Sequence, residues 1–213
     1  DQRYLDLRDL AHQAGQVEFG TFLFSLPEVS AYFPPDILEK SRQTVMDREK
    51  PVSPLDAFFN LFPKRKLARD LFAALEGARI DHCLRRNYRG LAEDMALLLP
   101  RIFESRPEIG TLSLQEAFAE ALLRLGALKK IGGRIPAPLS AHLEAMAAKI
   151  AILGREGADV GDSARLTIFF YQWLARIPNL PFSPAQGRWE EINPPPLSTE
   201  AERPGVDFAA RIS

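Results

Sequence analysis

The sequence predicts an all-α protein, a single multi-helix domain over residues 1–177 followed by a proline-rich extended tail over 178–213. Most segments before residue 178 repeat apolar residues at three- and four-residue steps, the spacing of one helix face. No segment sustains the two-residue alternation of a β-strand. Prolines at positions 178, 181, 184, 194, 195, 196 and 204 keep the last segment from being helical throughout, so we expect a strap or a linker.

The N-terminal part of the chain predicts two helices separated by a loop. Apolar residues recur at helical spacing over 3–19, and residues 22–26 either extend this helix or form a short aromatic segment. Pro27 is expected to interrupt any helix, which places a loop at 27–36. The stretch 37–49 has few apolar residues and predicts a polar helix on the surface.

The next part predicts a short helix and a long one. Residues 53–56, Ser-Pro-Leu-Asp, have a serine at the cap, a proline in the first turn and an acid three residues after the cap. The aromatic run 57–62 is expected to plug a core. A long helix follows over about 64–87 and is expected to end near Gly90, because glycine is favoured just after a helix.

The second half predicts four more helices. Residues 91–104 are amphipathic, and Pro100 is expected to kink or end that helix. Ser113-Leu114-Gln115-Glu116 is a capping-box sequence that opens a helix to about residue 128. An alanine-rich helix is expected over 139–153. Asp162 is expected to cap a last helix over 163–177. In the tail, Trp189 and Phe208 are expected to pin the segment to the helical body.

The composition excludes several classes of function. The 213 residues are 46% hydrophobic and 26% charged with a formal net charge of -1, so we expect no nucleic-acid partner. No window reaches the run of about 20 apolar residues that spans a bilayer. Cys83 is the only cysteine, so the chain has no internal disulfide, which fits a cytoplasmic protein. The chain begins at Asp1 without methionine, so we expect a piece of a longer or processed protein.

The segment around residue 76 is the most informative of the predicted long helix. Leu71, Leu75 and Ala78 recur at helical steps and predict a buried stripe. Glu76 and Arg79 lie one turn apart and are expected to pair. Glycine at the next position, 77, costs about 1 kcal/mol against alanine in a helix, so we expect a ligand or another backbone to pass close by.

The first helix holds His12-Gln13-Ala14-Gly15-Gln16, which has the spacing of a zinc-hydrolase signature. That signature uses a glutamate as general base and a second histidine as ligand. Gln13 cannot act as a base, and the amide of Gln16 is a poorer zinc ligand than imidazole. No catalytic residue is therefore assigned. A zinc site remains an alternative, with four candidate ligands: His12, Gln16, Glu76 and Asp81.

Residues 71–91, LFAALEGARIDHCLRRNYRGL, resemble the Glu-Asp-Ala-Arg-Ile-Asp … Arg-Arg-x-Tyr-x-Gly segment of NorD/CbbO-type proteins. The matching residues are Glu76, Arg79, Asp81, Arg85, Arg86, Tyr88 and Gly90. Residues 11–22, AHQAGQVEFGTF, are similar to the histidine-rich helix that precedes this segment in the same family. Together the matching blocks cover about 11–26 and 58–106. Gly77 departs from the family, which has an acid at that position.

The resemblance implies a function that spacing alone does not indicate. Proteins of this type carry a helical N-terminal region and a C-terminal von Willebrand factor A domain, and they work with MoxR-class AAA+ ATPases. They act as adaptors that bind the ATPase and recognise its client protein. We therefore expect a non-catalytic accessory domain of a MoxR-type chaperone system, without a cofactor. The Asp-x-Ser-x-Ser metal motif of the A domain is absent from these residues, so the tail is expected to be the linker toward that domain.

Two alternatives remain open from the sequence. The first is a divergent zincin-like metallohydrolase that uses His12 and Glu76 on a zinc ion. The second is a helical domain that binds a peptide or a protein in a groove under the proline-rich tail, lined by Phe169, Phe170 and Trp173.

Overall fold

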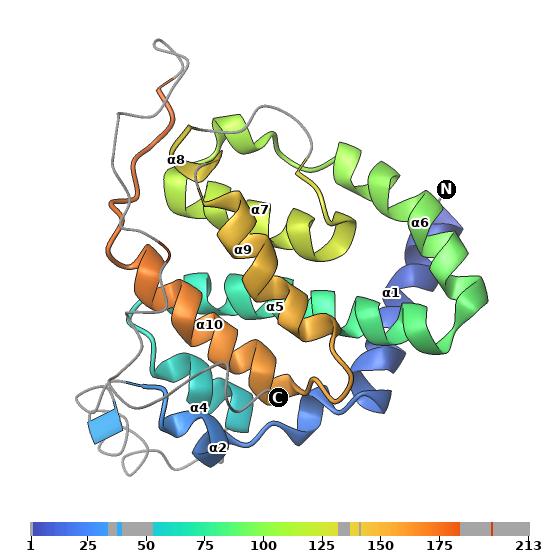
Figure 1. Cartoon of the computed structure of the whole chain (residues 1–213), viewed down its shortest axis with the longest axis horizontal. Helices are drawn as coiled ribbons and strands as arrows, with labels where there is room; N and C mark the ends of the chain where they lie inside the picture. Colours follow the sequence, from blue (N-terminus) through green and yellow to red (C-terminus); the bar gives the residue numbers. More distant parts are fainter. Residues whose placement is uncertain are drawn as a thin grey trace.

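The computed structural model describes residues 2–33, 38–39, 53–131, 137–140, 142–183 and 197, and these ranges contain helices joined by turns and no β-strand. The elements in chain order are α1 Gln2–Glu18, η1 Thr21–Leu23, α2 Leu26–Ser30, α4 Pro54–Asn60, α5 Arg65–Asn87, α6 Arg89–Glu104, η2 Ile109–Thr111, α7 Leu114–Leu128, α8 Ala137–Ser140, α9 Leu143–Ile150, η3 Ala151–Gly154 and α10 Val160–Leu174. The prediction of an all-α fold is confirmed, and the described helices form one domain (Figure 1).

Helix α5 lies at the centre of the domain and contacts α1, α4, α6, α7, α10 and η3. Figure 1 shows it crossing the middle of the molecule, with α7 on one side, α4 on the other and α1 with α6 at its far end. Leu71, Leu75 and Ala78 are all buried, which confirms the predicted apolar stripe. Because α5 is covered on several faces, its polar residues Glu76 and Arg79 are buried as well.

The aromatic run after Pro54 forms the plug that the sequence predicts. Phe58 is fully buried, and its ring lies 5.1 to 6.0 Å from the rings of five other phenylalanines: Phe24, Phe33, Phe59, Phe62 and Phe72. Most of these pairs are edge-to-face, the geometry that aromatic quadrupoles favour. The plug joins η1, α2 and α4 to the central helix. Ser53 caps α4 through a hydrogen bond from the Asp56 N–H, as predicted.

One proline and one glycine act differently from the prediction, although two helices end where the sequence places their ends. Pro27 does not interrupt a helix but lies in the first turn of α2, where its missing N–H has no helical partner to lose. Helix α5 ends at Asn87, as predicted, but Gly90 does not provide its stop, because Gly90 lies in the first turn of α6. Helix α6 ends at Glu104, as predicted, and Pro100 lies inside it, so of the two expected effects of this proline the ending of the helix is excluded.

The cap of the last helix is also displaced from the prediction. Asp159, not Asp162, is the N-cap of α10, and its carboxylate accepts the backbone N–H of Asp162 at 3.0 Å. Asp162 in turn accepts the backbone N–H of Asp159 at 3.0 Å, so the two acids form a reciprocal capping box. The helix therefore starts earlier than predicted and ends at Leu174.

The predicted helix over 139–153 is divided into α8, α9 and η3, with His142 as the N-cap of α9. The predicted polar helix over 37–49 lies outside the described residues, except for residues 38–39, which are helical. Trp189 and Phe208 also lie outside the described residues.

The beginning of the proline-rich tail is fixed to the start of α7. The backbone N–H of Leu114 donates to the carbonyl of Leu180 at 2.9 Å, and the N–H of Gln115 donates to the side chain of Asn179 at 2.9 Å. The amide of Gln115 donates to the carbonyls of Leu174 and Ile177, so it satisfies the end of α10. These contacts satisfy free N–H groups at one helix start and free carbonyls at one helix end.

A glycine allows α7 to pack closely on α5 in the core. A Cβ atom at Gly126 would lie only 2.6 Å from the Cβ of Ala78. Replacing Gly126 by alanine is expected to lower the free energy of unfolding by about 1–3 kcal/mol, because the added methyl overpacks this contact. Urea unfolding followed by circular dichroism measures the change.

Gly77 provides the matched control for this prediction. A Cβ atom there would lie 3.6 Å from the Nε2 of His12, an ordinary contact. The same change at position 77 is therefore expected to raise the free energy of unfolding by up to about 1 kcal/mol, since alanine is the better helix former. Equal stability of the two variants would contradict the close packing of α5 on α7.

Candidate functional site

The central feature of the motif segment is a buried ion pair within α5. Arg79 donates from Nε to Glu76 Oε2 at 2.8 Å and from Nη2 to Glu76 Oε1 at 2.6 Å. The two residues are 1% and 2% exposed, so the pairing predicted from their spacing is confirmed and is shielded from solvent. A two-pronged contact of this kind fixes both side chains in one geometry.

Other elements supply further hydrogen bonds to this pair. Thr21 in η1 and Ser163 in α10 each donate a hydroxyl to the carboxylate of Glu76. Arg79 also donates to the carbonyls of Phe19, at 3.0 Å, and Ala158, at 3.5 Å. Both oxygens of Glu76 are thus engaged, and the network joins α5 to the turn after α1, to η1 and to the start of α10. Thr21 and Ser163 lie 55 and 87 positions away from Glu76, and no local pattern marks them.

The network also holds the charge on Arg79. Burial by itself lowers the pKa of the guanidinium, but the hydrogen bond and the charge of Glu76 outweigh this effect and raise the pKa above its usual value. The arginine is therefore a fixed cation whose role is to compensate the buried carboxylate.

The candidate zinc ligands do not come together as one set. His12, Gln16 and Asp81 line the same cavity, and the His12 Nε2 lies 3.8 Å from Asp81 Oδ1. Glu76 does not line this cavity. It lies five positions before Asp81, so the two side chains point in different directions from α5, whereas Gly77 lies four positions before Asp81 and shares its face. Among the described residues, no group of three or more histidine, cysteine, aspartate or glutamate side chains is arranged to hold a metal.

The glycine at position 77 faces His12 and the cavity. A Cβ atom at Gly77 would lie 3.6 Å from the imidazole Nε2, so the neighbour of this glycine is a side chain, and the expected close approach of another backbone is not found there. The space in front of the glycine is large enough for a methyl group. Because glycine has no side chain, this face of α5 does not fill the space toward α1.

The other motif residues attach the end of α5 to its neighbours. Arg85 donates to the carbonyl of Ala127 near the end of α7 at 2.8 Å, and Arg86 pairs with Glu156 at 3.2 Å. Tyr88 donates its hydroxyl to Glu18 of α1 at 2.8 Å, and this hydrogen bond raises the pKa of the phenol. These three residues thus join α5 to three separate parts of the domain.

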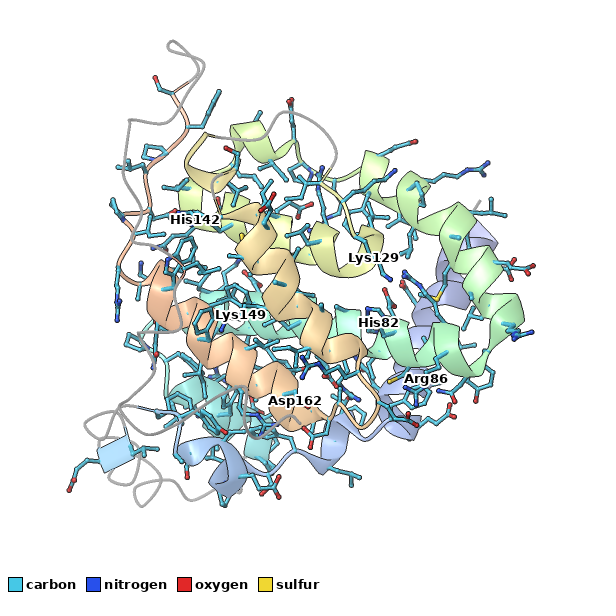
Figure 2. All side chains as sticks on the ribbon, viewed as in Figure 1. His82, Arg86, Lys129, His142, Lys149 and Asp162 are labelled. Carbon is cyan, nitrogen blue, oxygen red and sulfur yellow. The ribbon has the colours of Figure 1, made fainter. Side chains whose placement is uncertain are left out.

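The apolar residues expected under the tail belong mainly to the core. Phe170 and Trp173 are buried, while Phe169 is partly buried and carries the ammonium of Lys149 4.6 Å from its ring centre. Figure 2 places Lys149 beside α10 and His142 at the opposite end of α9. The ring of His142 lies 5.2 Å from that of Trp173, edge to face. Leu180, Phe182 and Leu197 from the tail pack against the same core.

His82 is a half-buried group whose titration affects stability. Its ring lies against η3, where a Cβ atom at Gly154 would meet the Cε1 at 2.9 Å (Figure 2). Burial lowers the pKa of His82 below its ordinary value of 6.5, and the nearby charges of Lys129 and Arg85 lower it further. The folded protein therefore resists protonation of this ring.

The domain is expected to lose stability as the pH falls below about 6.5, because the unfolded chain then takes up a proton that the folded chain excludes. Above that pH both states hold a neutral ring and this contribution is constant. Urea unfolding at a series of pH values measures the slope, and His82→Gln is expected to reduce it. The pKa of His142 is lowered by burial too, so His142→Gln serves as a companion variant. An unchanged slope in the double variant would contradict the assignment.

Comparisons with protein-family models, with curated proteins and with solved structures find no match to this chain. In the part of the chain that the structure describes, none of the helices combines the length and the apolar character that crossing a bilayer requires.

Proposed function

We propose that this chain is a non-catalytic adaptor domain that couples a MoxR-type AAA+ ATPase to a client protein. The observation that carries the proposal is the distribution of exposed apolar side chains. Among the described residues, the large hydrophobic side chains that are exposed all come from α1, η1, α6 and the turn before α6: Leu10, Val17, Phe22, Leu23, Tyr88 and Leu97. We call these six residues the apolar end.

The segments that carry the apolar end are neighbours in the fold. Helix α1 contacts both η1 and α6, and Figure 1 shows α1 and α6 together at one end of the molecule. Leu10 and Val17 are two helical turns apart and share one face of α1. Val17 is 70% exposed and Leu23 is 83% exposed, although each is a side chain that usually packs inside. Groups of exposed apolar side chains are typical of surfaces that bind another protein.

The chemistry of the motif residues supports a scaffold and not an enzyme. Glu76, the acid that the metallohydrolase alternative requires, has both oxygens engaged by Arg79, Thr21 and Ser163. A general base needs an oxygen that can accept a proton from water or substrate. The identity of the partner rests on the resemblance of residues 71–91 to NorD/CbbO-type proteins, whose partners are MoxR-type ATPases.

A binding experiment with serine variants tests the proposal. Purified MoxR-type ATPase from the organism that encodes the chain is immobilised with a non-hydrolysable ATP analogue, and binding of the domain is measured by interferometry. Replacing Phe22 and Leu23 by serine is expected to weaken binding by more than about tenfold. The reason is that an aromatic side chain such as Phe22, once buried in the complex, contributes about 2 kcal/mol or more to the binding free energy. Both side chains are exposed, so the fold is expected to remain intact.

The matched control replaces Ala147 and Ala148 by serine on the exposed face of α9. This variant also exchanges two exposed apolar residues for serine, but outside the apolar end, and it is expected to bind as the wild type does. Absence of binding by the wild type, or equal binding by the two double variants, would count against an adaptor role for this surface.

A further inference from the structure

Three side chains of the segment 19–24, which contains η1, point into the domain and fix the segment there. Phe19 is partly buried against a second hydrophobic cluster, formed by α5, α6 and the end of α7. Thr21 is buried and donates its hydroxyl to Glu76 Oε1. Phe24 is buried in the aromatic plug. The segment is therefore anchored at its start, in its middle and at its end.

The backbone of the same segment is held as well. Arg79 donates from Nη2 to the carbonyl of Phe19 at 3.0 Å, and the N–H of Phe19 donates to the carbonyl of Gly15 at 2.8 Å. Gly20 has a φ of 75°, which glycine adopts without a Cβ clash, and its carbonyl accepts the N–H of Leu23 at 3.0 Å. Backbone hydrogen bonds and the buried arginine thus fix the turn from α1 into η1.

Phe22 and Leu23 lie between these anchors and point away from the domain. They are 66% and 83% exposed, although Thr21 before them and Phe24 after them are each 4% exposed. A segment that is held on both sides keeps its exposed side chains in one place, so that binding costs little further conformational entropy. The buried ion pair of α5 therefore reaches the surface through this segment.

We propose that Thr21 is a positioning residue: through the Glu76–Arg79 pair it holds η1 as a rigid protrusion. Phe22 and Leu23 are thereby presented to the partner in a fixed geometry. The effect on binding rests on the adaptor function proposed above, whereas the order of η1 is a property of the domain alone. The two parts are tested by separate measurements.

The buried carboxylate supplies a matched pair of variants. Arg79 donates to both oxygens of Glu76. Oε1 also accepts the hydroxyl of Thr21, and Oε2 also accepts the hydroxyl of Ser163. Thr21→Val and Ser163→Ala each remove one hydroxyl from the same carboxylate, the first in η1 and the second in α10. Both are expected to lose a similar amount of stability, because each removes one buried hydrogen bond.

Backbone amide relaxation, measured by NMR on the isotope-labelled free domain, reports the order of η1. In the wild type the amides of Phe22 and Leu23 are expected to have order parameters of about 0.85, the value of a rigid backbone. Thr21→Val is expected to lower them to about 0.6 or below. Ser163→Ala, and Thr21→Ser, which keeps the hydroxyl, are expected to leave them unchanged. Flexible amides in the wild type, or equal order in Thr21→Val and Ser163→Ala, would overturn the proposal.

A second pair of variants leaves the buried carboxylate untouched. Gly20→Ala places a side chain at a φ of 75°, with its Cβ 3.3 Å from Leu23 Cδ1, so the amide order of η1 is expected to fall. Gly157→Ala is the control, because Gly157 has a φ of 80° in the turn before α10 and no described atom lies within 4 Å of its Cβ position. Equal order of η1 in these two variants would contradict its clamping.

Binding to the immobilised MoxR-type ATPase, measured by interferometry, tests the consequence for the partner. Thr21→Val is expected to weaken binding about tenfold, since the freed segment must be ordered again in the complex. Thr21→Ser and Ser163→Ala are expected to bind as the wild type does. Wild-type affinity of Thr21→Val would contradict the positioning role. If the wild-type domain does not bind the ATPase, the adaptor function fails, and the relaxation data alone decide the role of Thr21 in holding η1.

Discussion

Replacing Arg79 by alanine is expected to lower the free energy of unfolding by about 3–5 kcal/mol, because it leaves the carboxylate of Glu76 buried without its cation. Glu76 is 2% exposed, and among the described residues only the hydroxyls of Thr21 and Ser163 remain as its donors in this variant. Two hydroxyls do not offset the removal of a charged carboxylate from water. Urea unfolding at neutral pH, followed by circular dichroism and tryptophan fluorescence, measures the loss.

Arg86 is the control for this prediction, since it is an arginine on the same helix. It pairs with Glu156 in solvent, and Arg86→Ala is expected to cost less than about 1 kcal/mol. The double variant Glu76→Gln, Arg79→Met is expected to be more stable than Arg79→Ala, because it removes both charges together. Arg79→Ala losing no more than Arg86→Ala would mean that water reaches the pair.

Replacing Leu75 by alanine is expected to lower the free energy of unfolding by about 2–5 kcal/mol. Leu75 is 1% exposed and belongs to the main hydrophobic core, in the stripe that also contains Leu71 and Ala78. The loss combines the transfer of the missing side-chain atoms with the cavity that they leave in a packed interior. The same denaturation measurement applies, with the slope of the transition checked for two-state behaviour.

Leu97→Ala is the matched control, because Leu97 is a helical leucine that is 72% exposed. It is expected to change the free energy of unfolding by no more than about 0.5 kcal/mol. Should Leu75→Ala cost less than about 1 kcal/mol, the orientation of α5 in the core would be wrong.

The local elements of the fold were largely predictable from the sequence. The long helix α5, the capped starts of α4 and α7 and the aromatic plug are encoded by residues within one or two turns of each other, so short-range patterns indicate them. The errors at Pro27 and Asp162 arose because a proline and an acid are also favoured inside the first helical turn, and their spacing alone does not distinguish a cap from the positions that follow it.

The candidate sites were predictable only in part. The pairing of Glu76 with Arg79 follows from their spacing, but its burial depends on Thr21 and Ser163, which reach it from distant parts of the chain. The zinc site proposed from the sequence used His12 and Glu76 together as ligands. The structure separates them, because Glu76 points toward α10 while Gly77 and Asp81 face α1.

The sequence by itself determined the helical class, most helix positions and the ion pair of α5, because these depend on the 3.6-residue period and on neighbours one turn away. Only the tertiary structure decided which face of α5 meets which helix. That choice encloses the Glu76–Arg79 network and opens the cavity beside His12 and Asp81. The orientation of α5 is selected by packing between helices that are distant in sequence, and the sequence of one helix does not indicate where its partner lies.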